Sequence, residues 1–236
     1  MFFSLLLTDR RSISLLPAAF LSCFVSCFLR ADRTNYQLKT GVCSDDVCST
    51  ISGDGPGYTI DGGMVGEYCT LVFGADNLGL IAYKDSTPGV AALKVAHCTQ
   101  AACITATKTV VDSEGDSGNY ISIVLGTDGF GFIAHHDTTS GALRVVHCLD
   151  LQCSSSEKFV VDGSPRVGWY SSLALNPAAT GGGGRPLVAY YDDDLQDLRV
   201  LHCDNVKCSH GYYEVIDGLT EGSTSPPNAD GIGQHA

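Results

Sequence analysis

Residues 143–148 read Leu-Arg-Val-Val-His-Cys, and Cys153 follows after four further residues. The same pattern recurs from residue 93 and from residue 198, and a degenerate copy that starts at residue 38 stands first. Recurrence of one pattern at a nearly fixed period is typical of repeat architectures. The repeat therefore predicts the scaffold of this chain, whereas it says little about biochemical activity.

Each complete unit carries four short runs rich in Val, Ile and Tyr, joined by turns that contain Gly, Asp and Pro. Such runs predict four antiparallel strands that follow one another as a meander. A half-unit with two strands comes first, at residues 38–42 and 58–61. The strands expected in the three complete units are residues 68–73, 80–85, 93–98 and 107–112, then 120–125, 132–137, 143–148 and 159–162, then 170–175, 187–192, 198–203 and 213–217.

Four-stranded meanders on this period are the blades of β-propellers. The expected fold class is all-β, a partial and open β-propeller of about three and a half four-stranded antiparallel blades. Residues 34–217 would form this repeat domain, and residues 218–236 read as the truncated start of a further repeat. An open arc leaves unpaired strand edges and apolar faces, which predicts self-association.

The units resemble the disulfide-bearing propeller repeats that occur in tandem in secreted bacterial proteins, with their Gly-x-Tyr-x-Ser, Ala-Tyr-Tyr-Asp and Leu-Lys-Val-x-His-Cys-x4-Cys elements. The resemblance covers residues 38–217 and concerns the scaffold, because these repeats share no single assigned activity. The chain departs from the pattern at Cys69 and Thr70, which follow Tyr68, and at His135-His136-Asp137 in the second strand of the middle unit.

The chain is acidic, with a formal net charge of -12. No basic stripe is present that could neutralise phosphates, which argues against a nucleic-acid partner. The acidity is interpreted as a contribution to solubility, with cation binding as an alternative.

Eight of the 11 cysteines form four Cys-x4-Cys pairs, which favours an oxidising compartment. Disulfides are expected within each pair, because each pair brackets a tight connection between neighbouring strands. Zinc is the alternative, but the histidine and cysteine beside each other on a strand point to opposite faces. The expected pairs are Cys43–Cys48, Cys98–Cys103, Cys148–Cys153 and Cys203–Cys208, and Cys69, which has no repeat partner, is expected to remain a thiol in the core.

The first 33 residues predict export. Arg10 and Arg11 precede an apolar run at residues 12–29. Its length lies between a signal-peptide core and a short membrane span, so both a cleaved leader and an anchor remain open. Residues 24–27 faintly resemble a lipoprotein box, and a mis-started gene model is a further alternative. The expected location is secreted or cell-surface, with membrane contact only through this segment.

Ligands of propellers usually bind where the loops between consecutive blades converge, and here one such loop spans residues 112–120. It is rich in oxygen atoms that could hold Ca²⁺, although it lacks the spacing of a known calcium loop, and solvated turn residues are the alternative. No other cofactor and no metal site is expected. The candidate ligand-binding residues are Asp112, Glu114, Asp116, Asn119, Tyr120, His135, His136, Asp137, Trp169 and Tyr170.

Two further interpretations concern side chains that recur once per unit. His97, His147 and His202 are expected to be structural, for example closing a strand end through a backbone hydrogen bond, because a site would normally occur once. Arg144 and Arg199 alternate with lysine at one strand position, which suggests an exposed face.

The function expected is that of a secreted or surface-anchored, non-enzymatic binding or structural module for a glycan or a protein. The alternative is a hydrolase or lyase that acts on glycans from the same face of the propeller. Neither the Gly-x-Ser-x-Gly nucleophile motif nor the Asp box of sialidases occurs in the sequence.

Overall fold

The computed structural model of the chain describes residues 37–43, 51–52, 57–176 and 184–217. This part of the chain is all-β, with three four-stranded antiparallel sheets that follow two short two-stranded sheets. Within these ranges no helix is long and apolar enough to cross a membrane. The expected leader and the expected further repeat at residues 218–236 lie outside the described residues.

All twelve strands predicted for the complete units are present, and each sheet pairs its strands in sequence order. The first sheet contains β5 (Val65–Phe73), β6 (Gly79–Asp85), β7 (Ala92–Cys98) and β8 (Ala106–Asp112). The second sheet contains β9 (Asn119–Leu125), β10 (Gly131–Asp137), β11 (Ala142–Cys148) and β12 (Ser156–Asp162). The third sheet contains β13 (Val167–Asn176), β14 (Arg185–Asp192), β15 (Asp197–Cys203) and β16 (Gly211–Asp217).

Of the two strands predicted for the half-unit, residues 38–42 form two short strands with a break at residue 41, whereas residues 58–61 form one strand as predicted. β1 (Leu38–Thr40) pairs with β4 (Tyr58–Asp61), and β2 (Val42–Cys43) pairs with β3 (Ile51–Ser52). Leu38 lies opposite Asp61, as the equivalent leucine and aspartate do in the last strand pair of every complete sheet. The half-unit therefore corresponds to the third and fourth strands of a complete unit.

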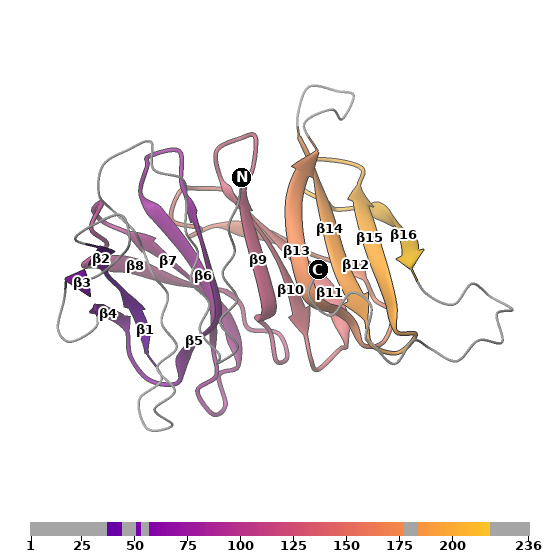
Figure 1. Ribbon diagram of the computed structural model, residues 1–236, viewed down its shortest axis with the longest axis horizontal. Helices are drawn as coiled ribbons and strands as arrows, with labels where there is room; N and C mark the ends of the chain where they lie inside the picture. The colour runs from indigo at the N-terminus through magenta and orange to yellow at the C-terminus, as the bar shows by residue number, and fades with distance from the viewer. Residues whose placement is uncertain (1–36, 44–50, 53–56, 177–183, 218–236) are drawn as a thin grey trace, which may run out of the picture.

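The three complete sheets follow one another from left to right in Figure 1, and the core lies between their facing sides. Apolar residues of the first and second sheets form one cluster, and those of the second and third sheets form another. The first strands β5, β9 and β13 are neighbours, since β9 packs against both of the others. A strand with a sheet on both sides has no solvent-facing side, and accordingly every residue of β6 and of β10 is buried.

A glycine at the start of each first strand sets the spacing of the sheets. Gly66, Gly118 and Gly168 adopt φ values of 97°, 87° and 88°. An added Cβ would lie 3.2, 3.1 and 3.0 Å from the Cα atoms of Leu38, Leu93 and Leu143 of the preceding sheet, respectively. The Gly-x-Tyr element is therefore needed both for its backbone conformation and for this close approach.

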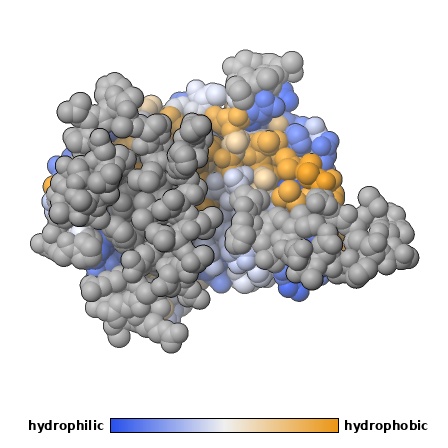
Figure 2. Space-filling view, viewed as in Figure 1, coloured by the Kyte–Doolittle hydropathy of each residue, from blue (hydrophilic) through white to orange (hydrophobic). Residues whose placement is uncertain are grey.

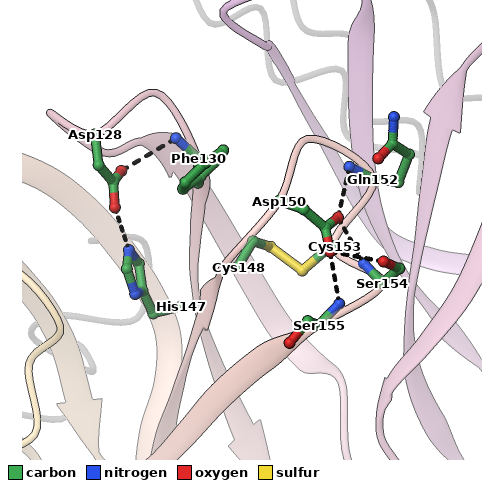
Figure 3. The surroundings of a disulfide bond; sticks show 9 residues. All are labelled: Asp128, Phe130, His147, Cys148, Asp150, Gln152, Cys153, Ser154 and Ser155. Atoms are coloured by element: carbon green, nitrogen blue, oxygen red, sulfur yellow. Dashed lines mark hydrogen bonds and ion pairs between the residues drawn. A yellow bond between two sulfur atoms is a disulfide. The ribbon is translucent and has the colours of Figure 1, made fainter.

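Three of the four predicted disulfides are present, namely Cys98–Cys103, Cys148–Cys153 and Cys203–Cys208, and they indicate an oxidising environment. Cys48 lies outside the described residues, and with it the pair Cys43–Cys48. Cys69 is a buried thiol, as predicted. In the loop of the middle sheet, the carboxylate of Asp150 accepts hydrogen bonds from the amides of residues 152, 154 and 155, which fixes the turn around its disulfide (Figure 3).

Candidate functional site

Three tyrosines from equivalent positions of the first strands come together in one row. The ring centroid of Tyr120 on β9 lies 5.0 Å from that of Tyr68 on β5 and 4.7 Å from that of Tyr170 on β13. Hydrogen bonds link the hydroxyl group of Tyr120 to those of the other two, and burial together with these neighbours raises its pKa. The phenol of Tyr120 therefore stays uncharged at neutral pH.

A local bulge aims the tyrosines at one another. Tyr68, Tyr120 and Tyr170 have φ values of 52°, 50° and 53°, a conformation that bulky residues rarely adopt. The register of each first strand against the second shifts at this point. Such a bulge re-aims a side chain, and here it turns the tyrosine out of the alternating pattern of the sheet.

Trp169 and His136 complete an aromatic cluster around the row, here defined as Tyr68, Tyr120, Tyr170, Trp169 and His136. The indole of Trp169 is stacked on Tyr120 with 5.3 Å between centroids, and the imidazole of His136 lies 5.8 Å from the indole. Within the described residues, the buried Nε1 atom of Trp169 has no hydrogen-bond partner. Tyr68 is 38% exposed, so solvent reaches one end of the cluster.

The imidazole of His136 is fixed by a backbone hydrogen bond and is kept neutral by its burial. Its Nδ1 atom donates a hydrogen bond to the carbonyl oxygen of Val167 at 2.6 Å. Burial lowers the pKa of this imidazole below the ordinary value of 6.5. The neighbouring His135 points the other way, toward the first sheet, where its Nε2 atom lies 3.5 Å from the carboxylate of Asp112. Its Nδ1 atom accepts a hydrogen bond from the amide of Gly118, just before β9. The two histidines therefore serve different faces of β10, as strand geometry predicts.

The acidic candidates form an ion cluster instead of a free ligand site. The carboxylate of Asp112 at the end of β8 is 3.1 Å from Nη1 of Arg144 on β11 and 3.0 Å from Nζ of Lys158 on β12. Nη2 of the same Arg144 lies 2.7 Å from the carboxylate of Asp137. Burial would raise the pKa of Asp112, but the neighbouring His135, the Glu114 amide and Lys158 outweigh it, so the pKa lies below its ordinary value.

Equivalent ion clusters occur at the two other sheet boundaries. Asp61 binds Lys94 at 2.5 Å, and Asp162 binds Arg199 at 3.0 Å. In each case the cation also reaches the aspartate that ends the second strand of its own sheet, Asp85 or Asp192. Each of these ion pairs joins two consecutive sheets. Because the arrangement recurs at every boundary, its role is structural.

The interpretation of Arg144 and Arg199 as an exposed face was wrong. Arg199 is only 4% exposed, and the side chain of Arg144 is only 12% exposed. Both side chains point toward the preceding sheet, and a buried charge needs an ionic partner from that neighbouring layer. The sequence could have suggested this, since an aspartate ends the fourth strand of each unit and a cation stands at one position of each third strand.

Asp116 and Asn119 bind a lysine that the sequence interpretation left out. Nζ of Lys84 lies 2.5 Å from the carboxylate of Asp116 and 2.6 Å from the side-chain oxygen of Asn119. Glu114 contacts the ammonium of Lys158 at 2.7 Å. The oxygen atoms considered for Ca²⁺ thus face cationic side chains, and the described residues contain no group of three or more acidic, His or Cys side chains that could hold a metal ion.

Two of the three recurrent histidines have a structural role, but a carboxylate replaces the expected backbone partner. Nε2 of His147 lies 2.7 Å from the carboxylate of Asp128 in the turn between β9 and β10 (Figure 3), and His97 pairs with Asp76 at 2.9 Å. His202 is stacked on Tyr212 with 5.0 Å between centroids. These contacts tie the end of the third strand to the rest of its own sheet.

The structure thus divides the ten predicted residues into three groups. Tyr120, His136, Trp169 and Tyr170 meet in the aromatic cluster, whereas Asp112, Glu114, His135 and Asp137 surround Arg144. Asp116 and Asn119 bind Lys84. Tyr68, Arg144 and Lys84 belong to these groups but were not predicted, although Tyr68 stands in the same Gly-x-Tyr element as Tyr120. Neither a family model nor a curated protein matches this chain, and the aromatic cluster is therefore the feature on which a functional proposal rests.

Proposed function

We propose that this chain is a secreted or surface-anchored repeat module of the β-propeller type that binds a glycan through its aromatic cluster. The proposal for the fold is an open arc in which the three complete sheets are blades. It is supported by the neighbouring positions of β5, β9 and β13, since the first strands of propeller blades line the central channel.

The observation that carries the proposal for function is the meeting of Tyr68, Tyr120, Tyr170, Trp169 and His136 at the start of the first strands. Tyrosine and tryptophan offer a flat apolar ring together with a polar handle. A sugar ring has the matching surface, with an apolar C–H face and a rim of hydroxyl groups.

Binding is favoured over hydrolysis by the charges beside the cluster. Glycoside hydrolysis needs a carboxylic acid whose pKa is raised so that it can donate a proton. The pKa of Asp112 is lowered, and Arg144 bridges Asp112 and Asp137. These carboxylates are ion-paired and suited to holding the sheets together.

The test is a glycan array followed by calorimetric titration of each hit. We expect Trp169→Ala and Tyr120→Ala to weaken binding by about tenfold or more, as is usual for central aromatic contacts. Tyr212→Ala is the matched control, because Tyr212 is 55% exposed on β16 and is not part of the cluster. Equal binding by all three variants, or binding only to proteins, would refute a glycan site here. Turnover of chromogenic glycosides that Asp137→Ala or Glu114→Ala abolishes would establish the hydrolase alternative.

A further inference from the structure

The second strands carry a buried residue that is tyrosine in two sheets and histidine in the middle one. Tyr83 on β6, His135 on β10 and Tyr190 on β14 each lie opposite the cation of their own third strand, so their positions are equivalent, and all three are 0% exposed. The two tyrosine hydroxyl groups donate hydrogen bonds to aspartates of the preceding sheet, Asp61 at 2.8 Å and Asp162 at 2.7 Å. His135 therefore departs from the repeat at a buried contact between sheets.

His135 makes a different pair of contacts in this place. Its Nε2 atom lies 3.5 Å from the carboxylate of Asp112, the counterpart of Asp61 and Asp162. Its Nδ1 atom lies 3.3 Å from the backbone nitrogen of Gly118. Because an amide N–H group can only donate a hydrogen bond, Nδ1 is the acceptor and carries no proton in this arrangement. The structure therefore holds the neutral form of the His135 imidazole.

The charges around His135 leave the Gly118 hydrogen bond as the main obstacle to a proton on Nδ1. The other charged and titratable groups around His135, Asp112 and Gly118 come from β6, β8 with its following loop, β9, β10, β11 and β12, and they are Lys84, Glu114, Asp116, Tyr120, His136, Asp137, Arg144 and Lys158. Every acid among them contacts a lysine or Arg144. The nearby carboxylate of Asp112 favours a positively charged imidazole. The hydrogen bond from Gly118 therefore opposes the proton that Asp112 attracts.

We infer that His135 is a proton switch for the aromatic cluster: a proton on its Nδ1 atom breaks the hydrogen bond from Gly118 and displaces the segment that carries Tyr120. Without this displacement, two N–H groups would face each other 3.3 Å apart in the interior, and a buried donor without an acceptor is costly. Tyr120, the central ring of the cluster, follows Gly118 by two residues. Only the displaced state can bind this proton, so its population rises as the pH falls.

The switch acts in mildly acidic surroundings, because histidine is the side chain that ordinarily takes up a proton between about pH 8 and pH 5. A glycan held by the aromatic cluster would then be released in acid. This consequence rests on the proposed function, whereas the switch itself is measured without any ligand, so the two can fail separately.

Trp169 reports on the switch directly, because it is the only tryptophan of the chain and is stacked on Tyr120. Its fluorescence, excited where tyrosine does not absorb, is followed on the full chain between about pH 8 and pH 5. We expect one transition that involves a single proton. On the acid side the Gly118 amide should exchange its hydrogen about tenfold faster, after correction for the intrinsic pH dependence of exchange, because it has lost a hydrogen bond. Unchanged far-ultraviolet circular dichroism checks that the chain stays folded.

Two substitutions of His135 should abolish the transition. His135→Tyr supplies the residue that the other two sheets carry at this position. His135→Asn places a side-chain oxygen near the Nδ1 position, which accepts from Gly118 without titrating, and it keeps the test decisive if tyrosine disturbs this boundary. His202→Asn is the matched control, because His202 lies on β15 of the third sheet, over which Figure 2 shows apolar atoms gathered, and its side chain is 33% exposed. It should leave the transition unchanged.

His136 needs a control of its own, because its imidazole lies 5.8 Å from the Trp169 indole and a proton there could change the fluorescence without any displacement. In His136→Asn the transition and the faster exchange at Gly118 should both persist. A transition that survives in His135→Tyr and His135→Asn but disappears in His136→Asn would overturn the inference. Fluorescence that does not change with pH, or exchange of the Gly118 amide that stays equally slow in acid, would overturn it as well.

Discussion

Asp112 at the end of β8 and Arg144 on β11 join two sheets through an ion pair in which the carboxylate is completely buried. Because Arg144 also contacts Asp137, one guanidinium group neutralises aspartates from two consecutive sheets. Each of the three sheet boundaries has such a cation, and the stability of the stack should depend on it.

Removal of the Arg144 guanidinium group tests whether the stability of the stacked sheets depends on it. Arg144→Met should destabilise the protein by about 3 to 5 kcal/mol, because Asp112 and Asp137 would remain buried without a full partner. Lys158→Met is the matched control, since the Lys158 side chain is 35% exposed although it binds the same Asp112, and it should cost about 1 kcal/mol or less. Urea unfolding measures both, and equal costs would contradict the distinction.

Gly118 tests the contact between sheets independently of charge. Gly118→Ala should cost about 3 kcal/mol or more, because the new Cβ meets the backbone of Leu93 in a conformation that disfavours alanine. Gly89 has a similar φ of 83° but open space around it, so Gly89→Ala should cost about 1 kcal/mol from the conformation alone. Thermal unfolding of the two variants compares these terms, and indistinguishable midpoints would show that the close approach to Leu93 is not required.

The neutral His136 should make stability depend on pH. Its lowered pKa means that the folded state binds fewer protons than the unfolded state, so its contribution is complete above pH 6.5 and is lost as the pH falls. The loss can reach about 1.4 kcal/mol per pH unit for one proton. His136→Asn keeps an amide donor near the Nδ1 position for the Val167 carbonyl oxygen but does not titrate, so the stability of this variant should decline less between neutral pH and pH 5.5. If the urea midpoints of the unsubstituted protein and of the variant fall equally as the pH is lowered, His136 is not the cause of the pH dependence.

Each disulfide should stabilise the loop that it closes and should affect the contacts between sheets little. Replacement of both Cys148 and Cys153 by alanine should cost about 2 kcal/mol, as expected for a closed loop of this length. Peptide mapping without reduction should find every bond within its own repeat, including Cys43–Cys48. Bonds between different repeats would disprove this assignment, and Cys69→Ala should leave the pattern unchanged.

The sequence by itself determined the twelve strands, the three sheets and three of the disulfides. It could do so because strand formation and the Cys-x4-Cys turn depend on residues close in the chain, and because the repeat supplied each pattern several times. The separation of His135 from His136 followed in the same way from the alternation of side chains along a strand.

Only the tertiary structure decided which residues meet across sheets. Tyr68 joined Tyr120 and Tyr170 because bulges turn these rings toward one another, and Arg144 became buried because its strand lies between two sheets. Both outcomes depend on how layers more than 30 residues apart are stacked, and the local pattern does not contain that information. The same reason explains the third sheet: its sequence repeats that of the others, and only the absence of a described sheet beyond it leaves Ile216 exposed where Val111 is buried.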